Sequence, residues 1–286
     1  MISDKQIPLS KCIDFTVDNR GKTAPTSDSG IPLIATNCID NENLYPVFRN
    51  IRYVSEDTYK NWFRAHPLEG DIILTLKGTP GRVCLVPENV GFVIAQDMVS
   101  IRVNFDKIYP LYLFAALRSR IVQHQIKTLD TSGVIPNLKK SDFDKVLIPN
   151  IDPNTQKYIG DLYHSLSLKA EHLKKQNHTL ETMAQTIFKE WFGKYQIGDE
   201  LPEGWKFGCL GDVAVNNSKT FKFNDKKVVF INTGDVLEGE FLHKNEISPV
   251  GLPGQAKKAI ELHDILYSEI RPKNKRFAFV NFDTSN

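Results

Sequence analysis

The chain has 286 residues, of which 41% are hydrophobic and 24% are charged. This composition predicts a globular protein of about two domains and argues against a disordered chain. Because the net charge is only +2, any nucleic-acid-binding face must be local. The sequence has no run of 18 apolar residues and no signal-peptide pattern, which predicts a cytoplasmic protein that has no membrane partner.

The four cysteines, Cys12, Cys38, Cys84 and Cys209, are too widely spaced for a paired zinc motif and too few for a disulfide framework. We expect them to be small buried hydrophobic residues in a reducing compartment. The sequence therefore predicts no metal site.

Residues 1 to about 150 alternate short apolar runs with Gly, Pro and Asn breaks. Strands are expected at residues 31–39, 70–76, 82–88, 91–95 and 98–105. Helices are expected at 55–65, with Ser55 as the N-cap, and at 109–126. Residues 131–151 predict a turn, a short capped segment and a strand. Strands and helices mixed without regular βαβ units indicate an α+β fold.

From Asp152 onward we expect one long helix, with Pro153 and Thr155 as start signals and Gly193 as the stop. Two seven-residue series, offset by four positions, form the seam of a coiled coil. The seam consists of Ile159, Tyr163, Leu166, Ala170, Leu173, Asn177, Leu180, Ala184, Ile187 and Trp191. At 1.5 Å per residue the helix spans on the order of 57 Å, which is too long for one wall of a small domain. Because the apolar seam is so narrow, we expect a partner helix. The alternative is a long amphipathic helix that lies on its own domain.

The pattern of residues 7–19 restarts at residues 205–217. Further on, IATNCI (34–39) aligns with INTGDV (231–236), and GDIILTL (70–76) aligns with HDILYSE (263–269). Identities are sparse, but the order, spacing and apolar pattern persist. This predicts a tandem repeat whose second copy is incomplete.

A variable α+β domain, a long helix ending in FKEWF, a linker LPEGW and then the same domain again resemble the specificity (S) subunit of type I restriction–modification systems. LSKCIDF and CLGDVAV resemble the start of its target-recognition domain. GDIILTLKGTPGRVCLV resembles the family's Gly-Asp-Ile strand, loop and return strand. SGVIPNLKKSDFDKVLIPNI followed by TQKYIGDL resembles the exit into the conserved helix. The resemblance covers essentially the whole chain, and the order of the motifs carries it.

The resemblance implies a first target-recognition domain at residues 1–151, the conserved helix at 152–193, a linker at 194–204 and an incomplete second target-recognition domain at 205–286. In that family, two such domains are held apart by two antiparallel helices, and each reads one half of a bipartite site in double-stranded DNA. Helix length sets the unread spacer. The helices also dock modification subunits that methylate adenine with S-adenosylmethionine, and a separate restriction and motor subunit uses ATP and Mg²⁺. The chain itself is then expected to hold no cofactor.

Motifs for catalysis do not appear in the sequence. There is no Gly-x-x-x-x-Gly-Lys-Ser/Thr phosphate loop and no Asn-Pro-Pro-Tyr/Phe tetrapeptide. We therefore expect a non-catalytic chain. Two alternatives stay open: a coiled-coil assembly scaffold that never touches DNA, and an independent DNA methyltransferase or nuclease.

Four loops offer basic and polar residues for DNA contact, because phosphates bind Lys and Arg while base edges bind Arg, Lys, Asn and hydroxyl groups. The candidates are Asn19, Arg20 and Lys22; Arg49, Asn50 and Arg52; Lys77, Thr79 and Arg82; and Thr131, Ser132, Asn137, Lys139 and Lys140. The loop 77–82 is the strongest candidate, because its glycines let the backbone approach DNA closely. For each loop the alternative is an ordinary solvated surface.

The unpaired seam leaves two possibilities for assembly. An antiparallel homodimer through residues 155–192 would carry two identical recognition domains and prefer inverted-repeat targets. Alternatively, the chain is a fragment or a frameshifted gene product that is monomeric or prone to aggregate. The sequence leaves open whether a second recognition domain is supplied in trans.

Overall fold

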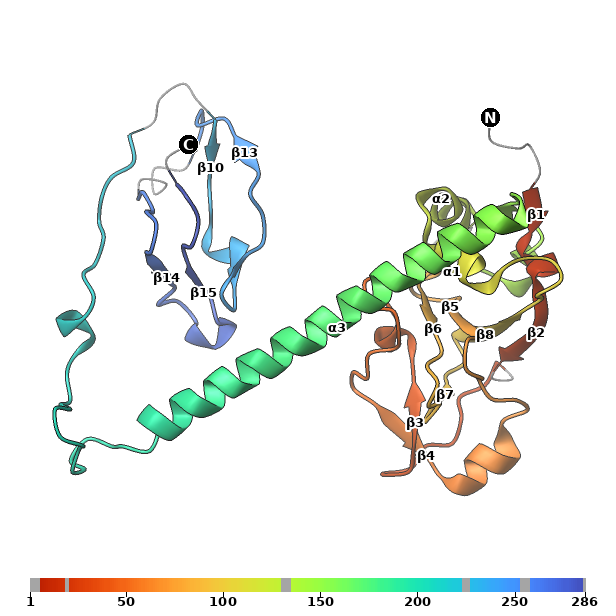
Figure 1. Cartoon of the computed structure of the whole chain (residues 1–286), viewed down its shortest axis with the longest axis horizontal. Coiled ribbons are helices and arrows are strands. Elements are labelled where there is room, and N and C mark those ends of the chain that lie inside the picture. Colours follow the sequence, from red (N-terminus) through yellow and green to blue (C-terminus); the bar gives the residue numbers. More distant parts are fainter. Residues whose placement is uncertain (1–5, 19–20, 130–134, 223–226, 253–257, 285–286) are drawn as a thin grey trace. The chain divides into compact units, whose positions relative to one another are not determined.

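The computed structural model describes residues 6–18, 21–129, 135–222, 227–252 and 258–284. The chain divides into two compact units, Met1–Lys194 and Tyr195–Asn286. The described residues of the first unit form three small sheets, short helices and one long helix, which confirms the α+β fold (Figure 1). Within the described ranges, no helix combines the length and apolarity needed to cross a membrane.

A four-stranded antiparallel sheet forms the centre of the first unit. Its strand order is β2 (Ile13–Asp18), β8 (Met98–Val103), β5 (Ile72–Thr75) and β6 (Val83–Leu85). Every residue of β5 and β6 is buried. Because both faces of these strands are covered, they read in the sequence as continuous apolar runs and show no alternation.

A second sheet packs beside the first, in the order β4 (Arg52–Val54), β3 (Ile31–Ile34) and β7 (Val93–Ile94). β3 pairs antiparallel with β4 and parallel with β7. Buried residues of both sheets share one hydrophobic cluster, for example Ile73 and Ile94. A separate pair joins β1 (Gln6–Pro8) to β9 (Leu147–Pro149), which lies just before the long helix.

Every predicted strand is found but is shorter than expected: 70–76 gives Ile72–Thr75, 82–88 gives Val83–Leu85, 91–95 gives Val93–Ile94 and 98–105 gives Met98–Val103. The strand predicted at 31–39 ends at Ile34, and a 3₁₀ turn follows at Thr36–Cys38. The helix predicted at 55–65 is confirmed at its start, where the Ser55 hydroxyl accepts the Thr58 amide at 3.1 Å. This helix continues as a π-helical turn, Thr58–Trp62, and ends because Phe63 adopts an extended backbone and enters the core.

The prediction of a single helix at residues 109–126 is wrong. Two helices, α1 (Pro110–Arg118) and α2 (Arg120–Thr128), meet at Ser119, whose backbone is extended. The Ser119 hydroxyl accepts the Val122 amide at 3.3 Å and so starts α2. The break turns Val122 into the core and leaves Ile121 exposed.

The long helix is confirmed as α3 (Pro153–Phe192), a single unbroken helix of 40 residues. The Asp152 carboxylate accepts the Thr155 amide at 3.0 Å, and Gly193 ends the helix. The first part of α3 packs on α1, whereas all its residues after Lys174 are exposed. In the first unit, α3 therefore projects well beyond the domain that it packs against (Figure 1).

The described residues of the second unit form three two-stranded antiparallel pairs. They are β10 (Val228–Val229) with β13 (Glu246–Ile247), β11 (Val236–Leu237) with β12 (Glu240–Phe241), and β14 (Ile265–Tyr267) with β15 (Phe277–Phe279). Among its described residues the buried hydrophobic side chains are Val236, Ala278 and Val280. This unit therefore has a far smaller core than the first.

Local features of the second unit repeat those of the first. Asp71 and Asp264, which the sequence alignment equates, accept amide hydrogen bonds from the residue three positions earlier, at 3.0 and 2.8 Å. The 3₁₀ turn Thr36–Cys38 has a counterpart at Thr233–Asp235, where the alignment places it. These correspondences support the tandem repeat, which stays a prediction.

The cysteine prediction is confirmed for Cys12, Cys38 and Cys84, which are buried and free. It is wrong for Cys209, which is exposed because the start of the second unit has little core around it.

Candidate nucleic-acid interface

Several predicted DNA-contact loops meet at one end of the four-stranded sheet. β2 ends at Asp18 opposite Val99, and β5 ends at Thr75 opposite Met98. The segment after residue 134 joins them, because the Gly78 amide donates to the Pro136 carbonyl at 2.9 Å. The loop 77–82 and the segment 135–140, far apart in sequence, are therefore neighbours.

Four lysines are exposed at this sheet end, and Asn137 lies among them. Lys77 forms a β-bridge with Asn137, and Lys140 forms an ion pair with Asp18. We define the strand-end surface as Lys22, Lys77, Asn137, Lys139 and Lys140. Lys22 belongs to it because the neighbouring Thr23 hydroxyl is bound by Gln96, just before β8. With four lysines against two carboxylates, Asp18 and Asp97, this sheet end keeps a modest excess of positive charge.

Arg82 and Thr79 have roles inside the protein that the sequence did not reveal. The half-buried Arg82 donates from Nη1 to the Ile39 carbonyl at 3.3 Å, and its amide donates to the Thr75 hydroxyl. The Thr79 hydroxyl is buried and has no hydrogen-bond partner among the described residues. Neither side chain is presented as a free contact at the loop tip.

The repeat supports a structural role for Arg82. In the second unit, Arg276 donates from Nη1 to the Val236 carbonyl at 2.9 Å. Val236 and Ile39 each directly follow the equivalent 3₁₀ turn, and Arg276 and Arg82 each directly precede the second strand of a hairpin. Both arginines thus fasten a hairpin to a turn.

The candidates Arg49 and Asn50 lie in the loop before β4, and Arg52 is the first residue of β4 in the other sheet. Arg49 forms an ion pair with Asp40 at 3.4 Å, and Arg52 is exposed on β4. Asn50 has a left-handed backbone, with φ of 48°. Asn19, Arg20, Thr131 and Ser132 lie outside the described residues.

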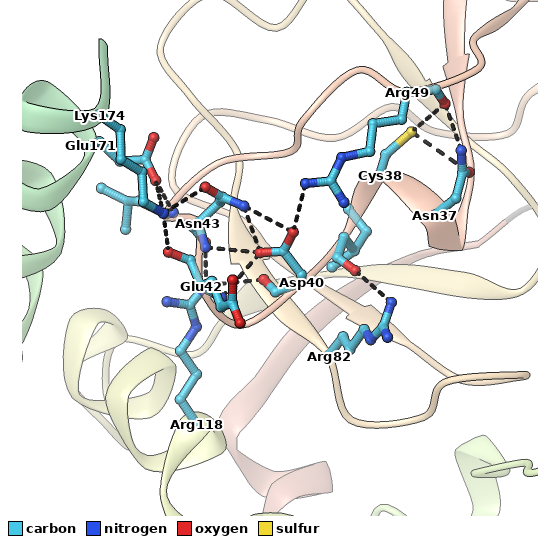
Figure 2. Close-up of polar contacts among 12 residues, drawn as sticks. Asn37, Cys38, Asp40, Glu42, Asn43, Arg49, Arg82, Arg118, Glu171 and Lys174 are labelled. Carbon is cyan, nitrogen blue, oxygen red and sulfur yellow. Dashed lines mark hydrogen bonds and ion pairs between the residues drawn. The ribbon is translucent and has the colours of Figure 1, made fainter. Parts of the chain in front are cut away.

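A partly buried polar network, which sequence reasoning missed, fixes the loop 40–44 against the helices (Figure 2). Arg118 of α1 donates to the carbonyls of Asn43 and Val83, the latter at 2.7 Å. The Arg118 guanidinium also lies 4.4 Å from the ring centre of Phe114. A cation that bonds backbone carbonyls and stacks on an aromatic ring holds its neighbours in one arrangement.

The long helix joins the same network. Lys174 donates to the Glu42 carbonyl at 2.8 Å and to the Asn43 side chain at 2.9 Å. The Glu171 carboxylate accepts the Leu44 amide at 2.9 Å (Figure 2). The loop 40–44, which precedes β4, is therefore tied directly to α3.

Asp40 lies at the centre of the loop. Its carboxylate accepts the Asn43 amide at 2.9 Å and the Glu42 amide at 3.0 Å. Burial acts to raise the pKa of Asp40, but hydrogen bonds from Asn43 and Glu42, together with Arg49, hold this pKa below its usual value. The folded loop therefore favours the ionised form of the Asp40 side chain.

α3 presents two different faces. Gln156 and Gly160 are buried against the domain, and Gln156 accepts the Tyr109 amide at 2.9 Å. The six large aliphatic and Trp residues of the predicted seam are instead between 37% and 62% exposed. Ala170, Asn177 and Ala184 are exposed as well. The seam is therefore available for a partner, as a coiled coil requires.

Tyr163 is the exception among the seam residues. Its ring packs edge-on against Phe114 of α1, with the ring centres 5.9 Å apart. Tyr163 is half-buried and contributes to the core of its own domain. In the part of the chain that the structure describes, no cluster of His, Cys, Asp and Glu has the geometry of a metal site.

The family model described as the type I restriction modification DNA specificity domain matches residues 18–182. The match runs from the end of β2 through most of α3, which is more than half of the chain. The chain belongs to this family. The region of this specificity-domain protein that the family model matches contains the strand-end surface and the polar network. It also contains most of α3, to which the network is tied.

Two curated relatives of this specificity-domain protein carry the same kind of name. The type I restriction enzyme HindI specificity subunit of Haemophilus influenzae is 57% identical over 83 residues, which cover 29% of this chain and 18% of the relative. The type I restriction enzyme MjaIX specificity subunit of Methanocaldococcus jannaschii is 23% identical over 265 residues, covering 84% and 59%. The chain thus spans less than two thirds of either relative.

Solved structures with some similarity to this chain include the HsdS subunit from Thermoanaerobacter tengcongensis, with a TM-score of 0.44 and 18% identity over 91% of this chain and 67% of that one. The S subunit of a type I restriction–modification system from M. genitalium gives a TM-score of 0.39 and 14% identity, covering 82% and 57%.

Proposed function

We propose that this chain is a DNA-recognition subunit of a type I restriction–modification complex and has no catalysis of its own. The family match carries the proposal, because it covers both the domain with the strand-end surface and the helix docked on it. Exposed lysines at the strand ends supply the phosphate contacts that hold a protein on duplex DNA. Base edges would be read by polar side chains of the same loops, such as Asn137.

In this proposal α3 sets the distance between two recognition domains. Its 40 residues correspond to about 60 Å of helix. The polar network around Arg118 and Lys174 holds the recognition domain in one orientation on the helix. The exposed length of α3 would also dock the modification subunits, which supply S-adenosylmethionine chemistry, and through them the restriction subunit.

We further propose that the seam of α3 pairs antiparallel with a second copy of this chain. In an antiparallel coiled coil, the two seam series face one another. A register centred on residue 175 places all ten seam positions opposite one another. The facing pairs are Ile159 with Trp191, Tyr163 with Ile187, Leu166 with Ala184, Ala170 with Leu180, and Leu173 with Asn177.

Size supports this register. Leu166 and Leu180 each face an alanine, so large side chains fill the space that small ones leave. Shifting the register by one heptad in either direction would leave seam residues without a facing partner. The Tyr163 layer is the weakest, because that ring is already engaged by Phe114.

Co-expression with the cognate modification subunit, followed by genome-wide mapping of methylated adenines, tests the function. We expect methylation at a bipartite motif, and at an inverted repeat if the homodimer is the active form. Methylation by the purified chain alone would indicate an enzyme. A stable complex that produces no sequence-specific methylation would indicate a scaffold and would contradict the proposal.

A further inference from the structure

The hairpin β14–β15 of the second unit reproduces the hairpin β5–β6 of the first. Ile72 pairs with Leu85 in the first hairpin, and Ile265 pairs with Phe279 in the second, so the three paired positions of each hairpin correspond one to one. Arg82 and Arg276 occupy equivalent positions and bind equivalent carbonyls. The loop 268–276 therefore corresponds to residues 75–82, which lie at the strand-end surface of the first unit.

The loop 268–276 carries four basic residues, whereas its counterpart carries two, Lys77 and Arg82. The four are Arg271, Lys273, Lys275 and Arg276, and the same loop has one acidic residue, Glu269. Arg276 is held by carbonyls, and Lys275 forms an ion pair with Glu238 at 2.9 Å. Arg271 and Lys273 are exposed, and among the described residues neither forms an ion pair. Two cations are thus left facing solvent.

The backbone holds this loop in a defined shape. A 3₁₀ turn at Pro272–Asn274 is flanked by Arg271 and Lys275, which have φ of 53° and 51°. Long side chains rarely adopt this left-handed conformation, and such residues persist where the surrounding structure enforces them, often at functional sites. Here the Asn274 amide donates to the Arg271 carbonyl at 2.8 Å, and the Ser268 amide donates to the Arg276 carbonyl at 2.9 Å. A preformed loop loses little conformational entropy when it binds.

We propose that Arg271 and Lys273 bind phosphate groups of double-stranded DNA, which makes the loop 268–276 the phosphate-contacting element of the second unit. The inference rests on the proposed DNA-recognition function. It assigns a specific site to a unit in which the sequence indicated no DNA-contact residue. Duplex DNA fits because the loop offers separate cations at a rigid turn, which matches backbone contact and does not require base reading.

The test compares the full chain with its R271Q/K273Q variant in binding to a random-sequence DNA duplex over a range of salt concentrations. Each phosphate contact adds about 0.9 to the slope of log affinity against log salt. The variant should therefore have a slope lower by about 1.8. Between about 50 and 200 mM salt, the factor by which Kd rises should be roughly twelve times smaller for the variant than for the wild type.

Two further variants make the result specific. R271K/K273R keeps both charges and should keep the wild-type slope. K206Q/K244Q removes two exposed charges elsewhere in the second unit and should also leave the slope unchanged; Lys244 lies over the Phe282 ring, past the other end of β15. Urea unfolding of every variant checks that the fold is retained.

The possible failures are distinguishable. If the wild type binds DNA and R271Q/K273Q keeps the same slope, the loop is not a phosphate site, while the proposed function stands. If R271Q/K273Q and K206Q/K244Q lower the slope equally, general charge accounts for the effect and the loop assignment is overturned. If the wild type shows no salt-dependent binding, both the inference and the proposed function fail.

Discussion

Gly160 of α3 lies directly against the backbone of Tyr112 in α1. A Cβ on Gly160 would stand 2.6 Å from the Tyr112 nitrogen and 2.9 Å from the carbonyl carbon of Leu111. No side chain can fit there unless the backbone moves. The absence of a side chain at one position thus determines how closely the long helix approaches the recognition domain.

Gly160→Ala should destabilise the protein by about 1–3 kcal/mol, because the added methyl group overpacks a contact with backbone atoms. Helix propensity alone predicts the opposite sign, a gain of about 1 kcal/mol. Urea unfolding measures the difference. Ser165→Ala, on an exposed part of the same helix, is the control and should change little. An alanine variant at position 160 that is as stable as the wild type would show that the helices do not meet as described.

The pH dependence of stability should identify Asp40. Because the folded pKa of Asp40 lies below its unfolded value of about 3.9, its charged form stabilises the fold above that pH. The stabilisation is lost as pH falls through the folded pKa. The difference in unfolding free energy between the wild type and Asp40→Asn should be constant from about pH 7 to 5 and should narrow below about pH 4.

Urea unfolding at several pH values measures this difference. Asp28→Asn removes one exposed negative charge and is the matched control. A difference that widens on acidification would mean that the Asp40 carboxylate is not favoured by the folded loop.

Arg82→Gln separates the structural and DNA-binding roles of the loop 77–82. The substitution removes a charged donor from the Ile39 carbonyl, so it should lower stability by roughly 1.5–3 kcal/mol. It should leave the salt slope of DNA binding unchanged. Lys77→Gln, at an exposed position, should do the reverse and lower that slope by about 1. A reduced slope together with unchanged stability in Arg82→Gln would restore the role predicted from sequence.

Cysteine cross-linking tests the antiparallel register. In that register Leu173 faces Asn177 of the second copy, so the variant L173C/N177C should form disulfide-linked dimers on mild oxidation. L173C alone should not, because Leu173 faces itself only in a parallel pair. Both variants carry C209S, because Cys209 is the exposed native cysteine among the four. Efficient linkage of L173C alone would indicate a parallel dimer, and no linkage in either variant would contradict pairing through the seam.

Long periodic segments were predictable from the sequence, and single cap residues were less so. The bounds of α3 follow from Pro153, Gly193 and a seven-residue repeat that runs from Ile159 to Trp191. The break at Ser119 was missed because apolar residues keep helical spacing across it. The hydrogen bond from the Val122 amide to the Ser119 hydroxyl starts a new helix in spite of that spacing. The new helix buries Val122 in the domain and leaves Ile121 exposed.

The polar network could not be predicted because its partners are backbone groups distant in sequence. Arg118 bonds a carbonyl 75 positions away, and Lys174 bonds one 132 positions away. Every residue has a backbone carbonyl, so no residue type in the sequence indicates which carbonyl a side chain will bind. The same reason explains Arg82: beside glycine and threonine it reads as an exposed loop cation, and only the fold shows the Ile39 carbonyl beside it.

The most direct test removes one heptad, residues 178–184, from the exposed part of α3 and maps the methylated motif of the co-expressed complex. The deletion preserves the seam pattern and lies beyond every contact of the polar network. It shortens the helix by about 10 Å, which is roughly three base-pair rises. We expect the two half-sites to keep their sequences and the unread spacer between them to become shorter. An unchanged spacer in a complex that still methylates DNA would contradict the claim that α3 sets the distance between recognition domains.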